Sequence, residues 1–403
     1  MKKISILLLL MVLSSILAAQ TDVKFDAQIR PRAELDDRDF FKDNDMSTIT
    51  YLRTRFGAMF TSGSDIEAYL QFQDSRYYGQ EKSTTVDMKN VDIHQAYFKI
   101  KDLFGLPLDV KAGRMEANYG TQRLVGAVGW SNVGRSFDGG VVTLKLDKTT
   151  FDFFTFQESE NLNPGDTLDM SFTGIHVNIN PDENLSIQPY LYLQSMVPST
   201  TLSRFTLGTL LKGNVKGLFG ELEAAYQFGK TTPVITELDI AAYLVAVNAG
   251  YNFDSKLNPY ISAGVEMLSG DENAADDKYE AFNTLYATNH KYYGYMDYFI
   301  NIPASTFNLG LSDIHVKAGF TPFDKFGVDL AIHMFNTLQD FTLISGDTST
   351  DLGTEVDLTL KYKYNKNVNF NLGVSLFGPG DIFKQTRGED GAFWSYFMTT
   401  VTL

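Results

Sequence analysis

Apolar and polar residues alternate one by one in segments spread along the whole chain, and this pattern constrains the fold more than any other feature. It begins in residues 23–35, where Val23 and Phe25 have one parity and Lys24 and Asp26 the other. It recurs in residues 65–72, 185–193 and 355–362. Successive side chains of a β-strand point to opposite faces, so each segment predicts a strand with one apolar and one polar face.

About 18 such strands can be placed along the chain, an even number like that of bacterial outer-membrane barrels. The predicted strands start near Val23, Ile49, Asp65, Val91, Leu108, Phe137, Thr150, Asp169, Leu185, Arg204, Leu218, Glu237, Leu257, Asp313, Phe326, Thr354, Val368 and Phe393. We therefore predict an all-β fold, a transmembrane antiparallel β-barrel. Lipid offers no partner for an unpaired backbone N–H or C=O, so a membrane-spanning sheet must close on itself.

The connections between the predicted strands alternate between short and long. The short ones are rich in Gly, Asn, Asp and Pro and comprise residues 61–63, 147–149, 180–184, 213–217, 252–256, 323–325 and 365–367. The long, polar ones comprise residues 36–47, 75–90, 114–136, 159–168, 269–312, 336–353 and 378–392. This rhythm predicts short periplasmic turns, long extracellular loops and both termini on the periplasmic side. A soluble sandwich or propeller is not expected to keep it.

The two ends of the chain carry targeting features. Residues 1–19 read as a signal peptide, with Lys2 and Lys3 before an uncharged run and small residues at a cleavage site near Ala19. That run is shorter than the roughly 20 residues of a membrane-spanning helix, so an anchor is the less favoured alternative. Residues 20–403 then form the barrel. The last segment, residues 393–403, resembles the C-terminal strand that the barrel-assembly machinery recognises, which makes this machinery an expected partner.

Composition excludes several other functions. The net charge of −15 argues against a nucleic-acid partner, and the absence of cysteine excludes disulfides, thiolate metal sites and a lipoprotein anchor. No catalytic or nucleotide-binding motif is present, so we expect neither an enzyme nor a cofactor. The five histidines, at positions 94, 176, 290, 315 and 333, show no metal-ligand spacing, so no metal site is expected.

Arginine is concentrated in the first third of the chain, where nine of the 11 arginines precede residue 140. Arg30 with Arg32, and Arg53 with Arg55, have spacing two, so each pair points to one side of its strand, and that side cannot be lipid. A lumenal patch of guanidinium groups suits carboxylate or phosphate groups on a solute. The alternative is a structural network in which the acids Glu34, Asp65, Glu67, Asp74 and Glu355 neutralise these charges.

One block of motifs resembles the alginate export family of outer-membrane proteins. It runs from Gly113-Arg114 through Tyr119-Gly120-x-x-Arg123-Leu124-Val125-Gly126 to Trp130-Ser131-Asn132-x-x-Arg135-Ser136-Phe137-Asp138-Gly139. Further agreement lies in Arg53-x-Arg55, Gln73-Asp74-Ser75-Arg76, His290-Lys291-x-Tyr293-Gly294-Tyr295-Met296-Asp297 and Gly353-x-Glu355-x-Asp357. The resemblance implies an 18-stranded barrel that passes the anionic polysaccharide alginate through an arginine-lined constriction. It makes Arg53, Arg55, Arg76, Arg114, Arg123 and Arg135 candidates for the lining, beside Arg30 and Arg32.

The leading hypothesis is therefore a channel in a bacterial outer membrane for an anionic solute, in particular an alginate-like polysaccharide or oligosaccharide. A general or sugar-selective porin without polyuronate specificity is the alternative within the same architecture. From other classes, a barrel hydrolase lacks a Ser or Asp placed beside a His, and a secreted soluble β-protein or adhesin would remain in solution without detergent.

Overall fold

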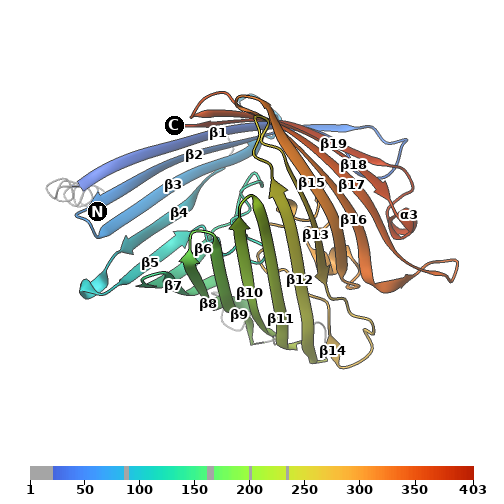
Figure 1. Cartoon of the computed structure of the whole chain (residues 1–403), viewed down its shortest axis with the longest axis horizontal. Coiled ribbons are helices and arrows are strands. Elements are labelled where there is room, and N and C mark those ends of the chain that lie inside the picture. Colours follow the sequence, from blue (N-terminus) through green and yellow to red (C-terminus); the bar gives the residue numbers. More distant parts are fainter. Residues whose placement is uncertain (1–20, 86–89, 161–167, 199–201, 233–235) are drawn as a thin grey trace.

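The computed structural model describes residues 21–85, 90–160, 168–198, 202–232 and 236–403. The predicted signal peptide, residues 1–19, lies outside them. Eighteen long strands form the barrel (Figure 1). They are β1 (Thr21–Asp37), β2 (Ser47–Ser62), β3 (Ile66–Tyr77), β4 (Val91–Ile100), β5 (Leu108–Met115), β6 (Phe137–Leu146), β7 (Thr149–Ser159), β8 (Leu168–Asp182), β9 (Leu185–Pro198), β10 (Leu202–Val215), β11 (Leu218–Thr231), β12 (Leu238–Asn252), β13 (Tyr260–Leu268), β15 (Leu311–Phe323), β16 (Phe326–Thr342), β17 (Thr348–Lys363), β18 (Val368–Pro379) and β19 (Ala392–Thr402).

These strands close into one antiparallel sheet. Each barrel strand pairs with the next one along the chain, and β1 pairs with both β2 and β19. The predicted 18-stranded barrel is therefore confirmed. A two-residue strand, β14 (Lys278–Tyr279), lies in a loop and pairs in parallel with β12. Four short helices complete the described structure: η1 (Leu103–Gly105), η2 (Asn289–Lys291), α2 (Ile302–Ser305) and α3 (Asp381–Thr386). Among the described residues no helix combines the length and the apolar composition needed to cross a bilayer.

One predicted loop is wrong. Residues 336–353 were expected to form a long loop, with the next strand starting near Thr354. Instead β16 continues to Thr342 and β17 begins at Thr348, leaving a connection of residues 343–347. The pairing between these two strands shifts register near Asn336 and again before Phe341. The irregular stretch breaks the strict two-residue alternation of apolar and polar residues. The sequence pattern therefore did not predict this part of the two strands.

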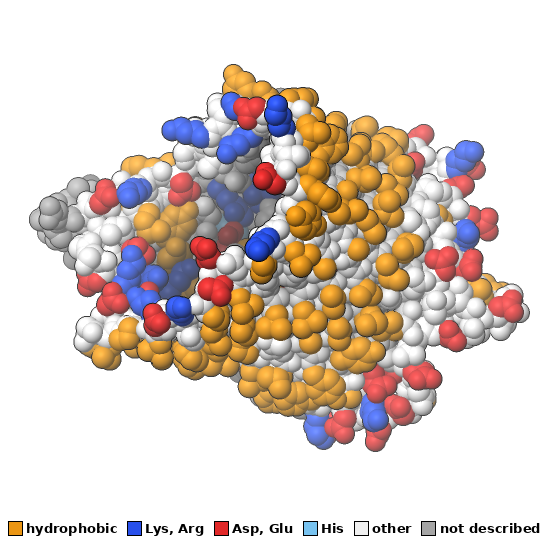
Figure 2. All heavy atoms as spheres, in the orientation of Figure 1, with side chains coloured by type: hydrophobic (Ala, Val, Ile, Leu, Met, Phe, Trp, Pro, Cys, Tyr) orange, Lys and Arg blue, Asp and Glu red, His pale blue; other side chains and the backbone are white. Residues whose placement is uncertain are grey.

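The barrel wall separates an apolar outside from a polar inside. On β1, Phe25 and Ile29 are 66% and 45% exposed, whereas Arg30 and Glu34, of the opposite parity, are each 5% exposed. Figure 2 shows apolar side chains spread over the outer wall, with charged groups gathered toward its ends and around a hollow. Exposed apolar surface of this extent suits a lipid environment.

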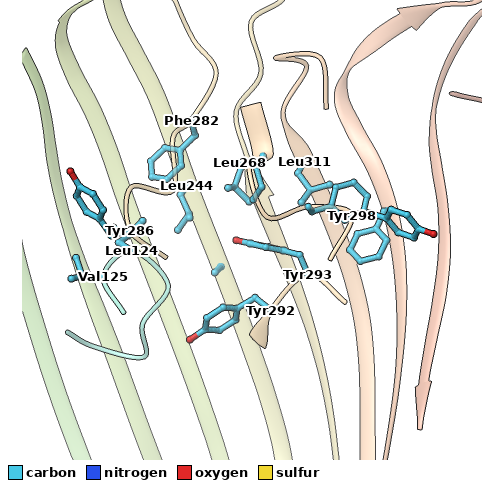
Figure 3. Packing of buried hydrophobic residues seen from close by; sticks show 14 of the residues in the cluster. Leu124, Val125, Leu244, Leu268, Phe282, Tyr286, Tyr292, Tyr293, Tyr298 and Leu311 are labelled. Carbon is cyan, nitrogen blue, oxygen red and sulfur yellow. The ribbon is translucent and has the colours of Figure 1, made fainter. Parts of the chain in front are cut away.

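Two long connections fold into the barrel and pair with each other. Residues 116–136 connect β5 to β6, and residues 269–310 connect β13 to β15. The Gly126 N–H donates to Tyr286 O at 2.9 Å, and the Tyr286 N–H donates to Leu124 O at 2.9 Å. Leu124 and Val125 pack beside Tyr286 inside the ring of strands (Figure 3), in a cluster that also holds Tyr293. The interior therefore contains a hydrophobic core made by the two inserted segments and side chains of the inner wall.

Candidate solute pathway

Two arginines of the inner wall bind the backbone of segment 116–136. Arg30 donates from Nη1 to Gly129 O at 2.7 Å and from Nη2 to Ser131 O at 2.8 Å. Arg53 donates from Nη1 to the same two carbonyl oxygens, each at 3.0 Å. Arg30 and Arg53 face each other across the β1–β2 pair. Two guanidinium groups thus converge on neutral acceptors, which leave their positive charge uncompensated.

Arg32 and Arg55 stand beside them, and each has an acidic partner. Arg32 Nε lies 2.6 Å from Glu34 Oε1, and its guanidinium stacks 4.1 Å from the centre of the Trp130 ring. Arg55 Nη1 lies 3.0 Å from Glu116 Oε1. We call Arg30, Arg32, Arg53 and Arg55 the arginine wall. With Glu34 and Glu116 as its ion-pair partners, this wall carries an excess of positive charge.

Arg123 lies inside the barrel in a different setting. Its Nη2 is 2.8 Å from Glu221 and its Nε 3.1 Å from Glu223, both on β11, while its Nη1 pairs with Glu266 on β13. The side chain is 3% exposed, and its guanidinium lies 4.0 Å from the centre of the Tyr292 ring. Three carboxylates more than balance its charge, so Arg123 fastens segment 116–136 to the wall.

Arg76 and Arg114 lie in ion pairs near strand ends. Arg76 pairs with Asp74 and, at 2.6 Å, with Glu81. It has the opposite parity from Ser75, whose hydroxyl donates to Asn132 O of the inserted segment, so Arg76 shares the outward side of β3. Arg114 Nη1 lies 2.7 Å from Asp138, and both side chains are more than one-third exposed.

Arg135 borders a cavity between strand ends and the two inserted segments. Its Nη1 donates to Gly126 O at 3.0 Å and also to Tyr286 O. The cavity measures about 480 Å³, and Arg114, Glu158 and Gln194 are among its other lining residues. Guanidinium, amide and carboxylate groups side by side can bind both a negative charge and hydroxyl groups.

Sequence reasoning missed an aromatic layer on the inner face of β6–β9. Phe154 stacks on Tyr119 with ring centres 5.0 Å apart, and Tyr190 stacks on Tyr192 at 4.7 Å. Tyr190 and Tyr192 are almost fully buried. The sequence contains aromatic residues at spacing two in these strands, which could have indicated the layer. Their inward position is explained by Tyr119 of the inserted segment, which packs against them.

One group of side chains could hold a metal ion within the part of the chain that the structure describes. Asp313 and His315 on β15 and His333 on β16 place their ligand atoms within 4.8 Å of one another. The spacing of the histidines in the sequence does not reveal this group, because His315 and His333 meet through strand register and not through a short repeat. The other three histidines have separate partners: Glu116 for His94, Gln188 and Tyr192 for His176, and Asp297 for His290.

The sequence profile of the family described as "Alginate export" matches residues 21–397. The chain belongs to this family. Several solved structures have a fold similar to that of this alginate export chain. OccK8 (OprE) of Pseudomonas aeruginosa has a TM-score of 0.60 at 13% identity, covering 95% of this chain and 98% of that one. OccD3 (OpdP) of the same species has a TM-score of 0.62 at 11% sequence identity, and the match covers 96% of this chain and 92% of that one. OccAB4 of Acinetobacter baumannii has a TM-score of 0.61 at 11% sequence identity, and the match covers 95% of this chain and 99% of that one. No protein of curated function is similar enough in sequence to match.

Family and fold together make this alginate export chain a porin-like channel of the outer membrane. Its neighbours in structure are porins and not enzymes, in line with the missing catalytic motifs. At 11 to 13% identity the structural neighbours share the fold alone. The solute of this chain has to be argued from its own residues.

Proposed function

We propose that this channel conducts an anionic solute, above all a uronate-containing polysaccharide or oligosaccharide, and that the arginine wall selects it. One observation carries this proposal: Arg30 and Arg53 donate hydrogen bonds to neutral carbonyl oxygens of residues 129–131. A charged carboxylate is a stronger acceptor for guanidinium than a carbonyl is. Arg30 and Arg53 are 5% and 4% exposed, so a passing uronate would replace these bonds as residues 129–131 move aside.

The other candidate arginines divide by their surroundings. Arg135 and Arg114, at the cavity of about 480 Å³, would meet the solute before or after the arginine wall. Arg123 is already outnumbered by Glu221, Glu223 and Glu266, so we assign it to holding the inserted segment. Arg76 lies on the outward side of β3, so we assign it no contact with the solute.

Reversal potentials across planar bilayers test the proposal. The wild-type channel should prefer anions, and Arg53→Glu combined with Arg55→Glu should shift the reversal potential toward cation preference. Arg76→Glu makes the same kind of substitution once, on the outward face of β3, and should leave selectivity nearly unchanged. Cation preference in the wild type, or no shift in the double variant, contradicts an arginine-selected pathway.

A narrower function has its own support, namely a porin for small anions or sugars. The inserted segments fill part of the interior, and a cavity of about 480 Å³ is of the size that holds small ligands rather than a polymer. OpdK of Pseudomonas aeruginosa, 13% identical, was solved with vanillate. Single-channel block separates the two functions. Polyuronate chains should block a polysaccharide channel at concentrations where their monomers do not, whereas a small-solute porin responds to the monomers alone.

We also propose how the chain reaches the outer membrane. Cleavage near Ala19 would release residues 1–19, and the strand over residues 393–403 would be read by the barrel-assembly machinery. Both termini would then face the periplasm, since β1 and the short turns share one rim.

A further inference from the structure

A second cluster of chemically active side chains lies on the inner wall, outside the arginine wall. Asp313 and His315 are two residues apart on β15 and point to the same side, and His333 of β16 is the direct cross-strand partner of His315. Their exposed fractions are 0%, 2% and 2%. The channel proposed above makes no use of them.

Both imidazoles turn the same nitrogen toward one carboxylate. His315 Nδ1 lies 3.1 Å from Asp313 Oδ2, and His333 Nδ1 lies 2.9 Å from Oδ2 and 3.0 Å from Oδ1. Ligand bonds to a transition metal are about 2.0–2.2 Å long, so ligands at tetrahedral to right angles stand about 3 Å apart. Both histidine–carboxylate distances match this spacing, and the ligand atoms of all three side chains lie within 4.8 Å of one another.

The neighbouring backbone is shaped to fit the rings. Gly264 of β13 lies directly opposite His315, and a Cβ there would stand 2.5 Å from Nε2 and 2.7 Å from Cε1 of the imidazole. The His333 ring stacks on Phe335 at 5.5 Å with an angle of 11°. The glycine and the aromatic ring thus fix both imidazoles in their orientation, as a preorganised site requires.

Carboxyl groups outnumber basic side chains around the cluster. Glu266 lies across from Asp313 and Glu355 across from His333, while Asp357 is the next acid on the same face of β17. Lys317 lies close to Asp313, Glu266 and Asp357, and Arg123 is shared by three glutamates. Buried charges need partners or a metal ion. With neutral histidines, a bound divalent cation would offset the excess of carboxylates.

We propose that Asp313, His315 and His333 bind a divalent transition metal ion, zinc being the ion to test first. Two imidazoles and one carboxylate suit zinc and its neighbours, whereas calcium and magnesium prefer oxygen ligands alone. The bound ion would link β15 to β16 beneath segment 269–310, and one coordination position would be left for water. The site is separate from the arginine wall and does not depend on which solute the channel carries.

Metal content after refolding tests the site. Because the ligands are buried, the full mature chain with a tag free of histidine is refolded into detergent with zinc chloride, with calcium chloride or with EDTA, then freed of excess ions by gel filtration. Zinc should co-elute in stoichiometric amount. His315→Asn and His333→Asn should each weaken zinc binding by about 100-fold or more. His176→Asn is the matched control, since His176 is also buried on the inner wall but contacts Tyr192 and Gln188.

Other outcomes overturn the proposal. Zinc at background level in the wild type, or equal zinc in the His315→Asn and His333→Asn variants, means that the three residues form a hydrogen-bonded cluster only. Equal retention of calcium removes the assignment to a transition metal. If the asparagine variants fail to fold, anomalous scattering at the zinc edge from wild-type crystals decides the question: a peak between the two Nδ1 atoms supports the site, and its absence refutes it.

Discussion

The same residue type performs different tasks inside this barrel, and its acidic neighbours decide which. Arg30 and Arg53 meet backbone carbonyls and keep their charge available, while Arg123 meets three carboxylates. A guanidinium that contacts only neutral acceptors can exchange them for an anion. A guanidinium that neutralises buried carboxylates cannot move away without leaving those carboxylates buried and unpaired.

This difference predicts how stability responds to mutation. Arg123→Met should lower the free energy of unfolding by about 3–5 kcal/mol, because it strands Glu221, Glu223 and Glu266 in the interior. Arg114→Met removes a half-exposed pair with Asp138 and should cost less than about 1 kcal/mol. Urea unfolding of the detergent-refolded barrel measures both. Equal losses in the two variants would refute the anchoring role of Arg123.

The alternation of side chains along a strand predicts which arginines point into the barrel and which point outward. Arg30 and Arg32 oppose the apolar face of β1, and their inward position follows from alternation alone. Arg76 has the parity of Phe72, which is 40% exposed, so the same rule places it on the outward face of β3. The family resemblance had grouped it with the others. No sequence pattern could show that Arg30 binds residues about 100 positions away.

At the scale of elements, the two inserted segments determine how much of the barrel remains open. Both are polar, glycine-containing loops by sequence, and nothing in their composition separates a loop in solvent from one folded inward. Their placement depends on pairings such as Val125 with Tyr286, which lie far apart in the chain. This is why the sequence alone could not show that these two loops fold inward.

Gly126 provides a way to separate the two segments. A Cβ at this position would collide with Thr288 Oγ1 and stand 2.8 Å from Cβ of Gln122. Gly126→Val should push the segments apart, lower stability by about 1–3 kcal/mol and raise single-channel conductance. Gly129→Ala is the control, because a Cβ at Gly129 meets nothing within 4 Å. Unchanged conductance in the valine variant would mean that this pairing does not limit the pathway.

Acid should loosen segment 116–136 at its first residue. Burial disfavours the charge of Glu116, but the hydrogen bond from His94 and the charge of Arg55 outweigh it, so the pKa of Glu116 lies below its usual value of 4.5. A carboxyl with a lowered pKa in the folded state stabilises above pH 4.5 and loses this effect as the pH falls below it. Current noise should therefore rise as the pH falls below 4.5. Glu116→Gln should be noisy at neutral pH and insensitive to acid; an unchanged acid response in this variant would assign the effect elsewhere.

For the whole molecule, the sequence predicted most of the barrel and little of its contents. Seventeen of the 18 predicted strand starts lie within three residues of the observed ones, because lipid outside and polar groups inside impose a strict alternation on every strand. The exception is β17, where the register shifts. The interior obeys no such rule. Its core depends on which side chains meet across the lumen, as Tyr119 does with Phe154.

The orientation of the barrel in the membrane gives the last prediction. The chain has no cysteine, so each serine-to-cysteine change creates a unique label site. Ser345 and Ser255 are both exposed, the first in connection 343–347 on the long-loop rim and the second in turn 253–259 on the rim of the termini. A membrane-impermeant maleimide should label Ser345→Cys in intact cells and Ser255→Cys only after the outer membrane is permeabilised. The reverse pattern would place both termini outside the cell.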